Sequence, residues 1–165
     1  TVRQTNRWEV HANTPIYHNG ELFYFSGYGS GSGKLTLSEN GAKITTDWKN
    51  PFDSRLGGAV LVDGYIYGSG DENSRDWQCI NWENGKTEWS SSDLAKGNVI
   101  YADGKLYCYS ERGELAIAKA SPQAFNVVSK TRVTAGTAQH WAHTMIDDGI
   151  LYLRHGDALV AYRVN

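Results

Sequence analysis

Three polar segments hold the residues whose types and spacing suit chemistry. Residues 71–76 offer oxygen ligands for calcium, but they lack the regular Asp-x-Asp-x-Asp-Gly spacing of a calcium loop. Residues 140–143 offer two imidazoles, yet positions three apart in an extended strand point to opposite faces. Residues 27–33 are rich in Gly and Ser, as phosphate loops are, but Lys34 opens an expected strand and not a helix. The sequence therefore predicts no metal site, and no Gly-x-Ser-x-Gly motif opens a helix after a strand.

A turn signal recurs four times along the chain. Asn-Gly or Asp-Gly is followed by any residue, then Leu or Ile, then an aromatic residue, and apolar residues precede each copy. The turn glycines are 44, 40 and 45 residues apart, at Gly20, Gly64, Gly104 and Gly149. Such a pair between two apolar runs predicts a β-hairpin, because both turn residues need positive φ.

Tryptophan recurs with nearly the same period. Trp8, Trp48 and Trp89 are 40 and 41 residues apart, and we expect them to dock one repeat onto the next. Residues 114–120 have helix propensity, but they align with residues 159–162 of the last repeat. We therefore predict a strand there and almost no helix in the chain.

Each repeat is predicted to form four short antiparallel strands, which is typical of a β-propeller blade. A sandwich or a closed barrel also fits many short strands, but neither predicts such regular turns and tryptophans. We expect an all-β fold with one domain over residues 1–165 and about four blades, at 14–48, 57–89, 97–133 and 142–165. Residues 1–10 are expected to be the outer strand of a preceding blade or of the last one. The blades then form a closed four-bladed ring or half of a larger, eight-bladed ring, which the non-Met start favours.

The stretch Asn84-Gly85-Lys86-Thr87-Glu88-Trp89 resembles the Gly-Lys-x-x-Trp ending of the PQQ-type (quinoprotein-like) propeller repeat. Residues 40–48 are similar to it more loosely, the third repeat lacks the Trp, and residues 141–162 resemble the last blade of such proteins. The resemblance implies the C-terminal half of a longer propeller. Its members include quinoprotein dehydrogenases, with quinone and calcium in the ring centre, and non-catalytic proteins such as scaffold lipoproteins of outer-membrane assembly.

The two cysteines bear on this choice. The dehydrogenases resemble one another in a vicinal disulfide, whereas Cys79 and Cys108 lie in different repeats. We expect both to be small buried apolar residues, and a disulfide between blades would need their α-carbons within about 7 Å. We therefore expect no cofactor; PQQ and calcium belong to the dehydrogenase alternative only.

The connections between the second and third strands, and those between blades, are expected at one end of the blades. These irregular segments are residues 26–33, 50–57, 68–76, 134–143 and 154–156. Loops on a rigid scaffold commonly carry binding residues. The candidate ligand-binding residues in these segments are Asp53, Arg55, Asp71, Arg75, His140, Trp141, His143, Arg154 and His155. A second interpretation places Trp141, His143, Arg154 and His155 at the mouth of a central channel.

Composition limits the partners. The 165 residues include 16 Lys plus Arg and 18 Asp plus Glu, a net charge of −2, which argues against nucleic-acid binding. No apolar run approaches the roughly 20 residues of a membrane span. We expect an extracytoplasmic, non-catalytic binding or scaffold module, with enzymatic activity left open. The alternatives are a fragment of a quinoprotein-like alcohol or sugar dehydrogenase and a glycan-binding propeller. The expected partners are the missing half of the ring or a second copy of the chain, and a protein or carbohydrate ligand.

Overall fold

The computed structural model describes residues 4–164, which form four antiparallel sheets, here called blades 1 to 4. Blade 1 contains β1 (Ile16–His18), β2 (Glu21–Ser26), β3 (Gly31–Ser38), the short 3-10 helix Glu39–Gly41 and β4 (Lys43–Asn50). Blade 2 contains β5 (Ala59–Val62), β6 (Tyr65–Ser69), β7 (Trp77–Asn81) and β8 (Thr87–Ser91). Blade 3 contains β9 (Gly97–Ala102), β10 (Lys105–Ser110), β11 (Glu114–Lys119) and β12 (Asn126–Arg132). Blade 4 contains β13 (Met145–Asp147), β14 (Ile150–His155) and β15 (Ala158–Arg163).

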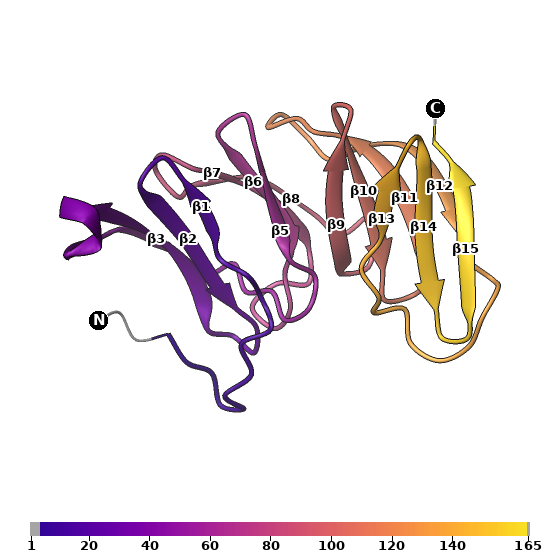
Figure 1. The fold of residues 1–165 in the computed structure, drawn as a ribbon, viewed down its shortest axis with the longest axis horizontal. Coiled ribbons are helices and arrows are strands. Elements are labelled where there is room, and N and C mark those ends of the chain that lie inside the picture. Colours follow the sequence, from indigo (N-terminus) through magenta and orange to yellow (C-terminus); the bar gives the residue numbers. More distant parts are fainter. Residues whose placement is uncertain (1–3, 165) are drawn as a thin grey trace.

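Within every blade, the strands that are consecutive in the chain are also neighbours in the sheet. The blades follow one another in an open row from the indigo N-terminal end to the yellow C-terminal end in Figure 1. The segment 114–119 is a strand despite its helix propensity, because it pairs with β10 on one side and β12 on the other. The expected all-β architecture of about four blades is thus confirmed. No helix within residues 4–164 is both long and apolar enough to cross a membrane.

Hairpin turns open the blades as the sequence predicts. The Asn or Asp before each turn glycine has φ between 45° and 49°, and each glycine has φ between 69° and 83°. Both residues are therefore in the left-handed region that this two-residue turn requires. The carbonyl of each glycine also accepts a hydrogen bond from a backbone amide near the end of the third strand of the same blade. The four donor residues are Leu37, Trp82, Ala120 and Val164, at 2.8, 3.0, 3.3 and 2.9 Å.

Three apolar clusters hold neighbouring blades together. Alternate strand residues face opposite sides of a sheet, so one face of a blade packs on the facing side of the next. Phe23 packs with Ile66 and Ile80 between blades 1 and 2, and Tyr67 packs with Leu106 and Ala116 between blades 2 and 3. Between blades 3 and 4, the third cluster joins Tyr107 to Leu151 and Leu153.

The tryptophans of the fourth strands bind the next blade. Trp48 donates from Nε1 to the carbonyl of Trp82 at 2.9 Å, and Trp89 donates to the carbonyl of Ser121 at 2.8 Å. In both strands a β-bulge comes directly beside the tryptophan. The same bulge is present in β12, where Ser129 takes the equivalent position. The bulge is thus common to three blades, and the tryptophan occurs in two of them.

Within the described residues, the N-terminal segment is not the outer strand of the last blade, and its assignment to a preceding blade stays a prediction. Residues 4–10 form a loop with a turn at Asn6–Glu9 and pair with no sheet, and residues 1–3 lie outside the described residues. Trp8 is 61% exposed and does not dock two blades. A fourth strand needs a neighbour with an open edge, and this segment lies at the far end of the row from β15. Among residues 4–164, no apolar cluster joins blade 4 to blade 1, so these blades do not close into a four-bladed ring.

The inner ends of blades 2 and 3 approach very closely. The amide of Val99 donates to the carbonyl of Gly57 at 3.3 Å. A methyl group built on Gly57 would overlap the carbonyl oxygen of Gly97. Glycine is therefore required at this point by the space between the two backbones.

Both cysteines are free and buried, as expected. Burial raises the pKa of the Cys79 thiol to about 12, and burial also raises the pKa of Cys108. These thiols are packing residues and not thiolate nucleophiles.

Candidate functional site

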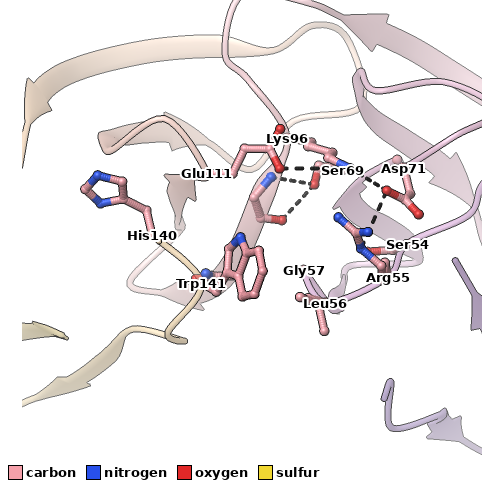
Figure 2. Close-up of a pocket in the computed structure, with 13 residues that line it drawn as sticks. Ser54, Arg55, Leu56, Gly57, Ser69, Asp71, Lys96, Glu111, His140 and Trp141 are labelled. Carbon is pink, nitrogen blue, oxygen red and sulfur yellow. Dashed lines mark hydrogen bonds and ion pairs between the residues drawn. The ribbon is translucent and has the colours of Figure 1, made fainter. Parts of the chain in front are cut away.

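One pocket lies at the loop-rich end, where connections from blades 2, 3 and 4 meet (Figure 2). Its cavity volume is about 40 Å³, room for a few water molecules, and its mouth is open to solvent. The β4–β5, β6–β7, β8–β9, β10–β11 and β12–β13 connections all contribute side chains. Among the sequence-predicted candidates, the pocket brings together Arg55, Asp71, His140 and Trp141.

Asp71 is the central charge of this pocket. Its Oδ1 pairs with Nζ of Lys96 and lies 3.9 Å from Nε of Arg55, while its Oδ2 accepts a hydrogen bond from the amide of Tyr28 at 3.1 Å. Burial raises the pKa of Asp71, but the hydrogen bonds from Lys96 and Tyr28 outweigh burial and hold that pKa below its ordinary value of 3.8. Asp71 is therefore an ionised anchor for two cations.

Asp53 organises the loops behind the pocket. Its carboxylate is completely buried, and four backbone amides donate to it. The amides of Gly29 and Glu72 bond Oδ2 at 2.9 Å, and those of Asp71 and Asn73 bond Oδ1 at 3.3 and 3.2 Å. One side chain thus joins a loop of blade 1 to a loop of blade 2. It is engaged in positioning these loops and does not face the pocket.

Gly97 and Asn98, the first two residues of β9, also line the pocket. The hydroxyl of Ser69 donates to the carbonyl of Gly97 at 2.7 Å and accepts from its amide at 2.9 Å. Asn98 is 3% exposed, and its Nδ2 donates to the carbonyl of Ala142 at 3.1 Å. The Oδ1 of Asn98 has no hydrogen-bond partner among the described residues. A buried acceptor in this state is rare in folded proteins.

His140 and Trp141, from the β12–β13 connection, form the blade 4 side of the pocket. The Tyr109 hydroxyl is hydrogen-bonded to Nδ1 of His140, and the ring of His140 stacks on that of His155 with centroids 3.6 Å apart. Burial lowers the pKa of His140, and the charges of His155 and Arg132 lower it further. His140 therefore favours its neutral form. Trp141, the next residue, is 51% exposed and lies between His140 and the Leu56–Gly57 backbone in Figure 2.

His155 itself lies behind the pocket and is buried. Its Nδ1 is 2.8 Å from the carbonyl oxygen of Ala135, and its Nε2 is 2.8 Å from that of Ala138. His155 thereby fastens the β12–β13 connection to the end of β14.

The remaining sequence candidates do not line this pocket. His143 is hydrogen-bonded by Nε2 to the carbonyl of Leu56 at 2.8 Å, and it joins blade 4 to the β4–β5 connection. Arg154 is exposed and donates to the carbonyl of Gly156 at 3.0 Å. Arg75 lines a separate depression beside Asp76 and Arg112.

Sequence reasoning missed Lys96, Asn98 and Glu111, which all line the pocket. Lys96 and Asn98 stand at the boundary of a predicted strand, where a polar residue is ordinary. Glu111 lies in the short turn between β10 and β11, outside the irregular segments that the sequence singles out. The stacking of blades brings these residues together, and no local spacing carries that information.

No three His, Cys, Asp or Glu side chains converge on a metal-sized point within residues 4–164. The carboxylate oxygens of Asp53 are engaged by amides, and Asp71 is paired with Lys96. These two side chains therefore do not offer a set of open oxygen ligands of the kind that calcium prefers.

Comparison with known proteins finds relatives by structure alone: no family model matches the sequence, and neither does any curated protein. BamB from Moraxella catarrhalis superposes with a TM-score of 0.69 at 18% identity, over 90% of this chain and 41% of that one. A europium-containing methanol dehydrogenase gives 0.69 at 11%, over 90% and 39%. The quinohemoprotein alcohol dehydrogenase ADHIIG from Pseudomonas putida HK5 gives 0.67 at 15%, over 86% and 28%.

The chain has a PQQ-like β-propeller fold. It spans less than half the length of each of these three propellers. Identities of 11–18% establish a common propeller architecture and no common activity.

Proposed function

We propose that this chain is a non-catalytic binding module whose ligand enters the pocket at the loop-rich end. The proposal rests on the ion pair and the hydrogen bonds that polar groups of the pocket already make with other residues of the chain. Asp71 is paired with Lys96, and the Ser69 hydroxyl is bonded to the backbone of Gly97. Nucleophilic catalysis needs a hydroxyl or thiol within hydrogen-bond reach of a base, and acid–base catalysis needs a group free to exchange its proton. The arrangement favours holding a ligand over transforming it.

The dehydrogenase alternative is supported by the fold shared with methanol and alcohol dehydrogenases. It is opposed by the donor set, because the pocket has only two carboxylates, Asp71 and Glu111, and Asp71 is paired with Lys96, which leaves no oxygen cluster for calcium. We therefore rank it second and derive no chemical step from it.

The two ends of the row support a larger assembly. Phe23, Tyr67 and Tyr107 occupy equivalent positions and are each at most 2% exposed, because the next blade covers them. Tyr152 is the equivalent residue of blade 4 and is only half-buried, and Leu159 beside it is 72% exposed. The opposite face of blade 1 presents Tyr17, which is 66% exposed. We propose that further blades of the same kind cover both faces, supplied by a longer chain or by a second copy.

An extracytoplasmic location is part of the same proposal, because it rests on the propeller resemblance. The full-length gene product tests it: a secretion or lipoprotein signal before the first blade supports the location, and a cytoplasmic protein without one contradicts it.

The catalytic question is tested by adding PQQ, calcium and a dye acceptor to the purified protein with a panel of alcohols and sugars. The proposal predicts no dye reduction above a sample without protein. Turnover that requires the protein would overturn it. Sedimentation of the same sample tests the assembly, which predicts at least twice the mass of one chain for a self-completed ring.

A further inference from the structure

We infer that the pocket binds a neutral saccharide, with Trp141 as the platform for one face of a sugar ring. This inference rests on the proposed binding function and names its ligand class. It follows from three properties of the pocket: its open hydrogen-bonding groups, its charge balance and its exposed aromatic ring.

Open donors and acceptors are both present. The guanidinium of Arg55 makes no hydrogen bond with a described residue, its nearest carboxylate oxygen on Asp71 being 3.9 Å away. It lies 5.4 Å over the ring of Tyr28, which holds it in place. The Glu111 carboxylate is one-third exposed, and its nearest cation is Nζ of Lys96 at 3.9 Å. Arg55 therefore offers donors to a ligand, and Glu111 offers acceptors.

Asn98 adds a buried acceptor. Its Nδ2 is fixed by the carbonyl of Ala142, so the side chain cannot turn its Oδ1 toward another partner without losing that bond. The Oδ1 stays unpaired among the described residues although Asn98 lines the pocket. Leaving a buried carbonyl unpaired is costly, and a ligand hydroxyl that reached it would remove that cost.

The charges of the pocket cancel. Arg55 and Lys96 supply two positive charges, and Asp71 and Glu111 supply two negative ones, with His140 favouring its neutral form. Two carboxylates would repel an anionic ligand, and two cations would repel a cationic ligand. Hydroxyl groups are neutral and both donate and accept, so a polyhydroxylated ligand matches this mixed set.

Trp141 supplies the apolar part of the site. It is 51% exposed at the side of the pocket, and the preceding residue, His140, is held by Tyr109. An exposed indole beside polar groups is suited to a ligand with one apolar and one polar face. A pyranose ring has both, because its axial C–H groups form a face that packs on an aromatic ring. The cavity of about 40 Å³ admits hydroxyl groups and not a whole sugar ring, so the ring would lie across the open mouth of the pocket, against Trp141.

The test uses an array of neutral glycans, together with sulfated glycans, uronate-containing glycans and dipeptides. The strongest neutral glycan is then titrated against the wild-type protein and against Trp141→Ala, Arg55→Met and Trp8→Ala. Trp8 is the matched control, because it is an exposed tryptophan outside the pocket. We expect Trp141→Ala to weaken binding about tenfold or more, Arg55→Met to weaken it less, and Trp8→Ala to leave it unchanged. Thermal unfolding of each variant verifies that it folds.

The inference is overturned if no neutral glycan binds, if only the anionic glycans or dipeptides bind, or if Trp141→Ala binds as wild type does. These results separate it from the proposed function. A neutral sugar that binds through Trp141 and is oxidised when PQQ and calcium are added would uphold the site and overturn the non-catalytic role. Absence of glycan binding without any turnover would overturn the saccharide site alone.

Discussion

Asp71 is a single buried side chain that faces both cations of the pocket. It is 3% exposed and pairs with Lys96 and, more distantly, with Arg55. Its pKa is lower in the folded protein than in the unfolded chain, so the unfolded chain binds more protons as the pH falls. The ionised carboxylate therefore stabilises the fold above pH 3.8, and this stabilisation is lost as the pH falls through the folded-state pKa.

Asp71→Asn is expected to reduce the free energy of unfolding at pH 7 by about 1–3 kcal/mol, because it leaves Lys96 without its nearest charged partner. It should also reduce the loss of stability as the pH falls below about 4. Urea unfolding at several pH values measures both effects. Asp93→Asn, a change at an exposed aspartate, is the control and should match wild type. Equal acid sensitivity in wild type and Asp71→Asn would contradict this role.

Residue-scale roles were the hardest to predict from sequence. Asp53 is a polar loop residue by pattern, and its burial beneath four amides depends on loops from two different blades. Lys34 lies in β3, where a charged residue predicts an exposed side. It is 2% exposed, because Nζ pairs with Glu21 at 2.6 Å and lies 5.5 Å from the centre of the Trp82 ring. Such partners are distant in sequence and leave no local signal.

At the scale of elements, the turns and fourth strands were predictable because their causes are local. A two-residue hairpin requires positive φ at both positions, which the Asn/Asp-Gly pairs supply. The docking tryptophans recur because each blade presents the same turn to the blade before it. Trp8 shares their spacing but is 61% exposed and docks no pair of the four described blades, so a docking role for it stays a prediction.

Trp89 provides a test of blade docking. It packs on Phe125 and Tyr67, with ring centroids 5.4 and 6.1 Å away, and it bonds the carbonyl of Ser121. Trp89→Ala should destabilise the protein by about 3 kcal/mol, the low end for large aromatic residues because Trp89 is half-buried. Trp89→Phe should cost about 1 kcal/mol, mainly the lost hydrogen bond. Chemical unfolding measures both, and Trp8→Ala should change nothing; equal losses at positions 8 and 89 would refute the docking role.

At the scale of the whole molecule, the open faces of blades 1 and 4 dominate. A charge placed on the free face of blade 4 should hinder assembly without harming the blade, because Leu159 is 72% exposed there. Leu159→Glu is therefore expected to keep the melting temperature of the unassembled chain and to weaken association with a second copy or with added blades. Sedimentation over a range of protein concentrations measures this. The equivalent change at Leu153, which is fully buried, is the contrasting control and should unfold the blade; unaltered association in Leu159→Glu would remove this face from the interface.

The missing side chain at Gly57 has a consequence for how many blades a ring can hold. The backbone of this residue rests almost directly against Gly97, so the first strands of blades 2 and 3, β5 and β9, lie close together at this end. In a closed ring whose first strands face the centre, the angle between neighbouring blades depends on this narrow spacing between their inner edges. A bulkier residue at Gly57 would spread the inner edges, bring neighbouring sheets nearer to parallel and enlarge the circumference. The absence of a side chain at Gly57 is therefore expected to help set the number of blades in the ring.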